Sequence, residues 1–433
     1  MADVMKTRVV KFGGTSLADA QQMRKAAGIV RSDPSRRFVV ASAPAGVTNL
    51  LYKLYDEREN GLGTLDRIRD IYRALVEGLG LKFNIFPHLG NIWNAANSIG
   101  SKDYIASRGE FINAQIFAEL LGYEFADAAD VILFHIDGKL DECATARNCR
   151  QLAKSGKNYV IPGFYGSLPH GKVKTFSRGG SDLTAAIVAA GTGAAVMEKW
   201  TDVPGMLMAD PGIVGGPQQV DVVTFSELRE LSYGGAKVLH DEVVFPLRAA
   251  RIPIMIRNTN EPEAQGTIIV PDDEAPRRPA GTIAGIAGRK NFRVVEITKA
   301  LMNQELGFLR RVCRVFEEHK VNIEHIPGGI DAISVIVADT ALNGKLGDIK
   351  AALQRRCKPD SIAADRSMSL ICTVGRGMVH TPGVAARLFQ AVADAGVSVQ
   401  MMDQGPSELS IIIGVANDDF EKAIRAIYRA LVP

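Results

Sequence analysis

The stretch Lys11-Phe-Gly-Gly-Thr-Ser16 follows an apolar pair and precedes a segment with helical spacing, Leu17 to Val30. A strand that ends in paired glycines and leads into a helix is a typical phosphate-binding arrangement, because glycine lets backbone N–H groups come close to an anion. Lys11 adds a point charge of the kind that contacts phosphate oxygens. Ser16 and Asp19 have the spacing of a capping box, which predicts that the helix begins at the glycine turn.

A plain tight turn between a strand and a helix is the alternative explanation for one Gly-Gly pair. Lys11 and a second pair, Gly179-Gly180, which also precedes a helical segment, favour the phosphate site. The spacing differs from that of a Walker A loop, in which the lysine follows the glycines. No third glycine stands where a dinucleotide-binding fold requires one.

Composition limits the class of protein. The 433 residues, 46% of them hydrophobic and 23% charged, suffice for two or three packed domains. A net charge of +3 argues against a nucleic-acid or membrane-surface partner, and no apolar run approaches the roughly 20 residues of a membrane span. The N-terminus lacks the apolar core of a secretion signal. Five cysteines without Cys-x-x-Cys spacing indicate free thiols in a reducing compartment, and the scattered histidines predict no zinc site. We therefore expect a cytoplasmic protein.

Up to about residue 270, short β-branched runs alternate with helical stretches, which predicts an α/β domain with a largely parallel sheet. The region 50–105 lacks strand signals and is expected to form a helical excursion. The segment 271–280 is rich in proline and charge and is interpreted as a linker. Strands are expected at residues 37–42, 131–134, 159–162, 195–197 and 252–256, and helices at 17–30, 111–121, 181–190 and 225–232.

The chain beyond the linker contains an internal repeat. Gly307 and Gly383 each lead a helical stretch, and the apolar positions after them match in order, including expected strands at 321–323 and 397–399. Each copy has the pattern of a βαββ unit. Two such units can pair their sheets edge to edge and bury surface that neither could bury alone.

Two polar clusters of the first domain are suited to a small ligand. The segment from Ser42 to Thr48 leaves a strand with small and hydroxyl side chains, although alone it is an average loop. Glu110 follows Arg108-Gly109 at the expected start of a helix, where the glycine would let a ligand approach the carboxylate. A lone glutamate at such a place is more often a surface residue that the helix dipole stabilises.

The cluster from Ser177 to Asp182 also precedes a helix. Arg178 can bind a carboxylate through two parallel N–H bonds, and Asp182 can orient a lysine, accept a metal or simply cap the helix. The segment 201–205 follows a strand at its carboxyl end, where open α/β sheets bind ligands, and Lys237 lies beside another glycine pair. This ordered set suits phosphoryl transfer to an acidic substrate, with magnesium bridging the phosphates.

These motifs resemble those of the aspartate kinases, members of the amino-acid kinase family that make β-aspartyl phosphate from aspartate and ATP. The resemblance covers essentially the whole chain, and the C-terminal repeat resembles the tandem ACT domains of these enzymes. It implies a three-layer sandwich with a mostly parallel sheet, followed by two βαββ-type ACT domains. The motifs that carry it lie at 11–16, 178–182, 201–205, 210–211 and 235–240. The implied domains are the catalytic domain 1–270, the linker 271–280 and the ACT domains 281–360 and 361–433.

The motif Ser-Arg-Gly-Glu at 107–110 suggests a monofunctional branch related to clostridial sequences. No homoserine dehydrogenase portion is expected after Pro433. The resemblance further implies feedback control by lysine, threonine or both, and a homodimer or homotetramer that forms through the ACT domains.

The resemblance also implies roles for single residues. Lys11 would bridge the phosphates and the aspartyl carboxylate, Asp182 would orient Lys11, and Arg178 would hold the α-carboxylate of aspartate. The residues implied in catalysis are Lys11, Asp182 and Arg178. Those implied in ATP binding are Lys11, Phe12, Gly13, Gly14, Thr201, Asp202, Leu207, Asp210, Lys237 and Val238. Those implied in aspartate binding are Ser42, Thr48, Glu110, Arg178, Gly179 and Ser181, with Glu110 pairing the α-ammonium. Mg²⁺ would arrive with the nucleotide, and no residue is predicted to bind a metal directly.

Related enzymes bind an amino-acid inhibitor between ACT domains. The positions implied here are Met302, Glu305, Phe308, Leu309, Ile323, Glu324 and Asp331. An acidic partner, Glu324 or Asp331, favours lysine over threonine as the effector. The alternative is that both acids are solvated turn residues.

Two positions depart from the family pattern: Gly212 replaces the usual Arg after Asp-Pro, and Asn113 replaces a frequent Ser. The first bears on ATP affinity. Two other functions stay open from the sequence. One is an amino-acid kinase for glutamate derivatives or carbamate. The other is an amino-acid-binding regulatory protein with a degenerate kinase domain.

Overall fold

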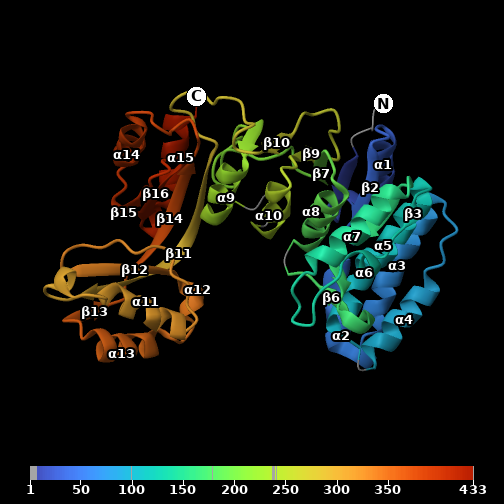
Figure 1. Ribbon diagram of the computed structural model, residues 1–433, viewed down its shortest axis with the longest axis horizontal. Coiled ribbons are helices and arrows are strands. Elements are labelled where there is room, and N and C mark those ends of the chain that lie inside the picture. Colours follow the sequence, from blue (N-terminus) through green and yellow to red (C-terminus); the bar gives the residue numbers. More distant parts are fainter. Residues whose placement is uncertain (1–6, 99, 178, 237–238, 240, 433) are drawn as a thin grey trace. The chain divides into compact units, whose positions relative to one another are not determined.

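The computed structural model describes residues 7–98, 100–177, 179–236, 239 and 241–432, and the chain forms two compact units (Figure 1). The first unit comprises the described residues up to 206, residues 219–229 and the described residues of the range 237–276. The second comprises 207–218, 230–236 and the chain from 277 onward. Two segments within the range predicted for the catalytic domain, 207–218 and 230–236, thus belong to the second unit.

The first unit is built on one eight-stranded sheet in the order β3-β4-β2-β1-β7-β9-β10-β8. All neighbouring strands are parallel except β9 and β10, which confirms the predicted mostly parallel sheet. The strands are β1 (Arg8–Phe12), β2 (Arg36–Ala41), β3 (Glu124–Phe125), β4 (Tyr159–Pro162), β7 (Val196–Thr201), β8 (Val222–Thr224), β9 (Ile254–Asn258) and β10 (Thr267–Val270).

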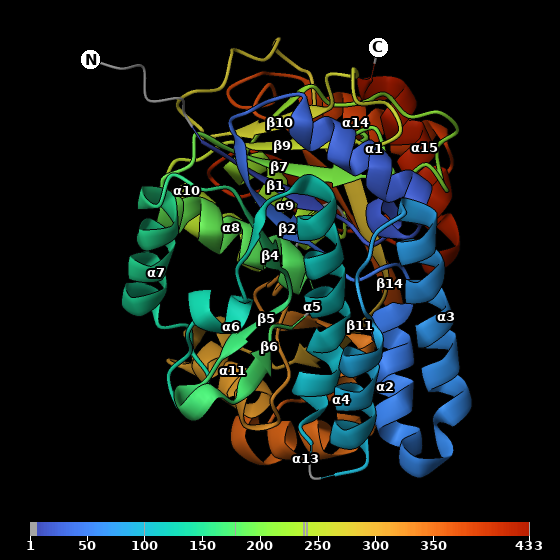
Figure 2. The ribbon, with the colours of Figure 1, turned by 90° about the vertical axis from the view of Figure 1, so that its right-hand side faces the viewer.

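Helices cover both faces of this sheet, so the first unit is a three-layer sandwich (Figure 2). On one face, α8 (Gly180–Thr192) packs on β1, β2 and β7, with α7 (Glu142–Lys154) and α10 (Asp241–Ala249) against it. The other face carries α1 (Ala20–Arg31) and α5 (Lys102–Leu121), with α2 (Val47–Glu57), α3 (Leu62–Leu79) and α4 (Phe86–Ala96) further out. These last three helices confirm the predicted helical excursion. Shorter elements include η1 (Thr15–Leu17), α6 (Ala128–Val131), β5 (Tyr165–Ser167) and β6 (Val173–Thr175). Helix α9 (Phe225–Gly234) begins in the first unit, and its residues from 230 belong to the second.

The predicted start of the first helix and the strand predicted at 131–134 were wrong. Helix α1 begins at Ala20 rather than at the glycine turn, because Asp19 is its N-cap and accepts a hydrogen bond from the Gln22 N–H at 2.8 Å. Ser16 lies in the short turn η1, where its hydroxyl is 2.8 Å from that of Thr259. The strand expected at 131–134 is absent because Asp127 caps the short helix α6 there, and only isolated bridges follow.

The second unit contains a sheet in the order β12-β11-β14-β16-β15, in which β13 also pairs with β11. Its strands are β11 (Gly285–Thr298), β12 (Ala332–Ala338), β13 (Ser361–Ala363), β14 (Ser367–Val374), β15 (Val399–Asp403) and β16 (Ser410–Val415). Its helices are α11 (Phe308–Glu318), α12 (Asp339–Leu342), α13 (Leu346–Cys357), α14 (Val384–Asp394) and α15 (Phe420–Leu431). The long strand β11 pairs with β12 of the first copy and with β14 of the second, so the two copies share one continuous sheet.

The backbone conformation explains why a glycine precedes each repeat helix. Gly307 and Gly383 are the N-cap residues of α11 and α14, with φ of 76° and 87°. Only glycine adopts this left-handed conformation without strain. The strand expected at 321–323 is not formed, because only single bridges at His325 and Gly328 reach β12. Among the described residues, no helix is long and apolar enough to cross a membrane.

Candidate active site

The candidate site lies where the strand order of the first sheet reverses. β1 stands between β2 on one side and β7 on the other, so the loops that leave their carboxyl ends diverge and open a crevice. Lys11 is the fourth residue of β1, Ser42 directly follows β2, and Thr201 is the last residue of β7. Three segments predicted to bind ligands therefore start from one edge of the sheet.

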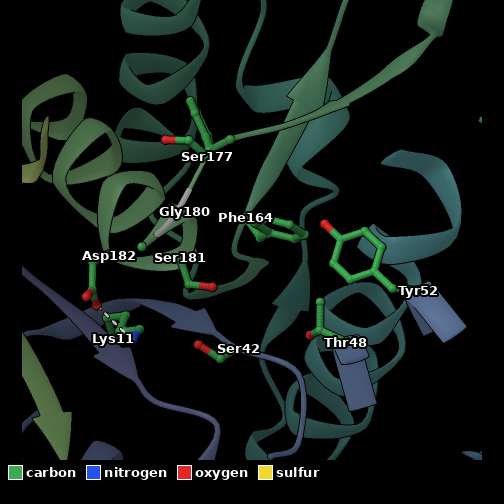
Figure 3. A pocket seen from close by; sticks show the side chains of 11 residues that line it. Lys11, Ser42, Thr48, Tyr52, Phe164, Ser177, Gly180, Ser181 and Asp182 are labelled. Carbon is green, nitrogen blue, oxygen red and sulfur yellow. Dashed lines mark ion pairs between the residues drawn. The ribbon is translucent and has the colours of Figure 1, made fainter. Parts of the chain in front are cut away.

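A cavity of about 470 Å³ occupies this crevice (Figure 3). Six of its lining residues were predicted from the sequence: Lys11, Ser42, Thr48, Gly179, Ser181 and Asp182. Two others, Ser177 and Gly180, belong to the cluster 177–182 that the sequence analysis singled out, and Tyr52, Phe164 and Phe176 were not predicted. Phe164 has a left-handed backbone with φ of 81°, an uncommon conformation for a bulky residue and one that is found mostly where function requires it.

A buried charge cluster lies at one end of the cavity. The Lys11 ammonium is 2.7 Å from Oδ1 of Asp182, the first acidic residue of α8. Lys199 of β7 lies 2.9 Å from Oδ2 of the same carboxylate. Burial lowers the pKa of Lys11, while Asp182 opposes this effect. Burial by itself would raise the pKa of Asp182, but the two ammonium groups hold it well below its usual value.

Lys199 was missed by the sequence reasoning. It stands inside a strand, between Glu198 and Trp200, and belongs to no glycine cluster. Strand register is the signal that reveals it: β1 and β7 are parallel, and Lys11 is the partner of Lys199 in the ladder. The ion pair between Asp182 and Lys11 is the contact that the predicted orienting role requires, and the role itself stays a prediction.

Glu110 is a buried carboxyl group in the middle of α5, not at a helix start as predicted. The helix begins at Lys102, after the N-cap Ser101, and 5% of Glu110 is exposed. Burial raises its pKa to about 8, although the backbone of Ala43 and the charge of Lys11 both oppose the shift. Its Oε2 has no hydrogen-bond partner among the described residues. A buried acceptor of this kind is suited to a cationic ligand group.

Gly109 has a packing role, and its predicted role in ligand access stays a prediction. A Cβ at this position would lie 2.9 Å from the Cβ of Ala43, so glycine allows α5 to approach the loop after β2. Gly14 shows the same constraint, because its Cβ would lie 2.8 Å from the carbonyl oxygen of Ala43. The Gly14 carbonyl also accepts a hydrogen bond from Ala45 N–H at 3.1 Å. The phosphate-type turn and the Ser42 loop are therefore packed as one block.

The two departures from the family pattern have local structural roles. Asn113 of α5 donates from Nδ2 to the Ser42 carbonyl at 2.7 Å and so fixes the start of the loop that lines the cavity. In the second unit, Gly212 N–H donates to Oδ1 of Asp210 at 2.8 Å and closes a tight turn.

The remaining residues predicted for the nucleotide site lie in different parts of the structure. Thr201 donates to the Asp202 carboxylate at 3.1 Å, and Gly13 N–H donates to the Trp200 carbonyl at the same distance. Leu207 and Asp210 belong to the second unit. Arg178, Lys237 and Val238 lie outside the described residues. Among the residues that the structure describes, no three His, Cys, Asp or Glu side chains are grouped to hold a metal ion.

Comparison with known proteins decides the family. The amino acid kinase family matches residues 6–258, and an ACT domain matches residues 371–431. Aspartokinase 3 of Bacillus subtilis is 33% identical over 462 aligned positions, which cover 98% of both chains. The chain belongs to the aspartokinases. It is therefore an ATP-dependent kinase of the amino acid kinase family, with C-terminal ACT-type repeats.

Solved aspartokinase structures share the fold over the whole length. The Clostridium acetobutylicum aspartate kinase is 43% identical, with a TM-score of 0.87, and the match covers 98% of this chain and all of that one (100%). Escherichia coli aspartokinase III with aspartate and ADP is 27% identical, with a TM-score of 0.80. The same enzyme with lysine and aspartate gives a TM-score of 0.75. Both E. coli structures cover 99% of this chain and 100% of their own.

In this aspartokinase, the predicted effector residues are split between core and surface. Met302 and Phe308 are buried in the core of the first repeat, whereas Leu309 is exposed. The carboxylate of Glu305 pairs with Lys299 and Arg311, and these cations lower its pKa.

The two acidic residues that the sequence proposed for a cationic effector differ in their contacts. Glu324 forms an ion pair with Arg289 at 2.9 Å, and 13% of its side chain is exposed. Asp331 is exposed, and its Oδ1 accepts a hydrogen bond from Leu301 N–H at 2.8 Å. Ile323 is partly buried against the same core.

Proposed function

We propose that this aspartokinase transfers the γ-phosphoryl group of ATP to the β-carboxylate of L-aspartate and produces 4-phospho-L-aspartate. This reaction is the first step of lysine, threonine and methionine biosynthesis. The observation that carries the proposal is the buried Lys11–Asp182 ion pair at 2.7 Å, which lies in the cavity at the sheet crevice. Glu110, with its raised pKa, lies near enough to Lys11 to interact with it electrostatically.

The chemistry requires charge neutralisation more than proton transfer. An oxygen of the ionised β-carboxylate attacks the γ-phosphorus, the bond from that phosphorus to the bridging oxygen breaks, and ADP leaves. The attacking group is already ionised at neutral pH, so the step needs no general base. Lys11 is assigned to neutralise the charge on the transferring group, with Asp182 holding it in place. The Gly13-Gly14 turn is assigned to the phosphates. Mg²⁺ arrives with the nucleotide and is part of that substrate.

Aspartate recognition is assigned to the residues around the Ser42 loop. Glu110 would pair with the α-ammonium, for which its buried and unpartnered Oε2 is suited. Ser42, Thr48 and Ser181 line the cavity and offer hydroxyl groups to the substrate. Arg178 keeps the role that the resemblance implies, on the α-carboxylate. The ATP roles of Thr201, Asp202, Leu207, Asp210, Lys237 and Val238 also stay predictions.

Substrate choice tests this assignment. Hydroxylamine traps an acyl phosphate as a coloured hydroxamate, so aspartate and glutamate can be compared with ATP under the same conditions. We expect kcat/KM for aspartate to exceed that for glutamate at least 100-fold, because an extra methylene moves the carboxylate away from Lys11 when Glu110 holds the ammonium. Equal rates with both, or a higher rate with glutamate, would favour the rival amino-acid kinase function. No product from either would favour the regulatory-protein alternative.

Lysine is the proposed feedback effector, and the segments 302–309 and 323–331 are the proposed site. Its support is the E. coli relative solved with lysine. Within this site Asp331 is the better partner for the lysine side chain, because Arg289 already neutralises Glu324. Inhibition requires lysine to bind one conformation more tightly, typically by a coupling of about 1–3 kcal/mol.

Titration calorimetry of lysine and threonine checks the effector site. Asp331→Asn keeps an acceptor for Leu301 N–H but removes the charge, and should weaken lysine binding about tenfold or more. Asp365→Ala removes an exposed aspartate from another loop and should bind lysine like the wild type. Unchanged lysine binding in Asp331→Asn would exclude this site. The homodimer or homotetramer and the cytoplasmic location also stay predictions, the first of which light scattering can measure.

A further inference from the structure

Lys199 is a second lysine of the charge cluster that the proposed reaction has not yet used. It lies directly beside Lys11 on the neighbouring parallel strand, at the same register. Partners at one register in adjacent strands project their side chains to the same face of the sheet. Here that face is covered by α8, which carries Asp182. The two ammonium groups are therefore brought to one carboxylate by the sheet itself.

Such an arrangement is unfavourable for folding alone. The side chains of Lys11, Lys199 and Asp182 are only 9%, 14% and 11% exposed. Two like charges that are adjacent on neighbouring strands repel each other, and each buried cation loses its hydration. One carboxylate provides a single negative charge for both, through Oδ1 at 2.7 Å and Oδ2 at 2.9 Å. The three side chains together carry a net charge of +1.

The charge count shows what Lys199 adds. Without it, Lys11 and Asp182 would form a pair with no net charge, and the attraction of Lys11 for phosphate would be largely cancelled by its own partner. Glu110, which also interacts with Lys11, adds little negative charge near neutral pH because its pKa is about 8. With Lys199 present, Asp182 is shared by two lysines, and these three side chains carry a net positive charge beside the cavity that receives an anion.

We propose that Lys199 is a positioning residue for phosphoryl transfer, which shares the Asp182 carboxylate so that Lys11 keeps its positive charge for the transferring phosphoryl group. This inference rests on the proposed function of the site. It assigns Lys199 an action through Asp182 and not a contact with aspartate. The consequence is specific: loss of the Lys199 charge lowers kcat while aspartate binding is largely preserved.

Three substitutions at one position separate charge from packing. Lys199→Met keeps the length of the side chain without the charge. Lys199→Gln keeps a hydrogen-bond donor for Asp182 without the charge, which protects the fold if the methionine variant is unstable. Lys199→Arg keeps both. The matched control is Lys157→Met, which removes an exposed lysine from a lysine–carboxylate pair of the same 2.9 Å separation, with Glu124, away from the cavity. Steady-state kinetics and thermal melting are measured for each purified full-length variant.

The expected pattern is a 10- to 100-fold lower kcat for both Lys199→Met and Lys199→Gln, with the KM for aspartate within about threefold of the wild type. Lys199→Arg should recover most of the lost kcat, and Lys157→Met should behave like the wild type. Melting temperatures of the neutral variants should not fall, because each substitution removes a buried like-charge repulsion.

Three results would overturn the proposal. One is a near-normal kcat for Lys199→Gln, which would show that the charge is not needed. Another is an equally low kcat for the glutamine and arginine variants, which would assign the effect to shape. The third is a loss of kcat that is matched by a large drop in melting temperature in all three variants, which would indicate a structural role. The proposed function is tested separately: if Lys11→Ala and the wild type are equally active, the function fails whatever Lys199 does.

Discussion

The pH dependence of aspartate binding follows directly from the burial of Glu110. Its carboxyl group has a pKa of about 8, so at pH 7 only about a tenth of the free enzyme carries the charge that the α-ammonium of aspartate requires. The apparent affinity is reduced by that fraction. The KM for aspartate should therefore fall roughly 20-fold between pH 6.5 and 8.5, with most of the change below pH 8.

Glu110→Gln removes the ionisation and keeps the size of the side chain. The variant should have a KM for aspartate about 10–100-fold above the wild-type value at pH 8.5, because a charge-assisted bond to the ammonium is lost. This KM should no longer change between pH 6.5 and 8.5, and the KM for ATP should change little. Glu119→Gln, an exposed position on the same helix, is the matched control. A wild-type KM that is flat over this pH range would refute the assignment of Glu110 to the ammonium.

The same group predicts a stability effect of definite sign. Its pKa rises from the usual 4.5 to about 8 on folding, so between these values the folded state binds more protons than the unfolded chain. The free energy of unfolding therefore decreases as pH rises through this window, by an amount on the order of 5 kcal/mol for a fully buried group. Between pH 6 and 8.5, the melting temperature of Glu110→Gln should fall less than that of the wild type. Saturating aspartate should make the melting temperature of the wild type less dependent on pH, because the α-ammonium of aspartate stabilises the ionised Glu110 carboxylate. The difference between the wild type and Glu110→Gln should therefore become smaller.

Three further substitutions test the packing around the cavity and the charge of its ion pair. Gly14→Ala places a Cβ 2.8 Å from the Ala43 carbonyl oxygen, so it should lower the stability by about 1–3 kcal/mol and lower kcat/KM for both substrates. Asn113→Ala removes the donor to the Ser42 carbonyl, and the KM for aspartate should rise severalfold with a stability loss of about 1–3 kcal/mol, measured by urea unfolding. Asp182→Asn should reduce kcat at least 100-fold without a comparable change in the KM for aspartate.

The first strand and its glycine turn were predictable because their signals are local. An apolar run, two glycines and a lysine within six residues define both the turn and the position of Lys11. The contact between Lys11 and Asp182 joins residues from distant parts of the chain. The residues alone left open whether Asp182 orients a lysine, accepts a metal or caps the helix, and the family resemblance favoured the first. Lys199 was not predictable, because only the register of β7 against β1 places it beside Lys11.

The position of Glu110 was predicted wrongly for a physical reason. Helix α5 is buried on most of its surface, between the sheet and the outer helices, and so it lacks the alternation of polar and apolar faces that marks a surface helix. Its start does carry a local signal, the N-cap Ser101 with Asp103 in the first turn, which the sequence analysis did not use. The assignment of 207–218 to the second unit depends on non-local pairing, in which Ile286 N–H donates to the Met208 carbonyl at 2.7 Å.

The most direct test of the central claim is the ATP-dependent formation of aspartyl hydroxamate by the wild type and by Lys11→Ala, at saturating aspartate and ATP. The account predicts robust product with the wild type and a kcat lower by about 10²–10³ or more in the variant, since the ammonium that neutralises the transferring phosphoryl group is gone. A Lys11→Ala enzyme that is folded and turns over at a near-normal kcat would contradict the account.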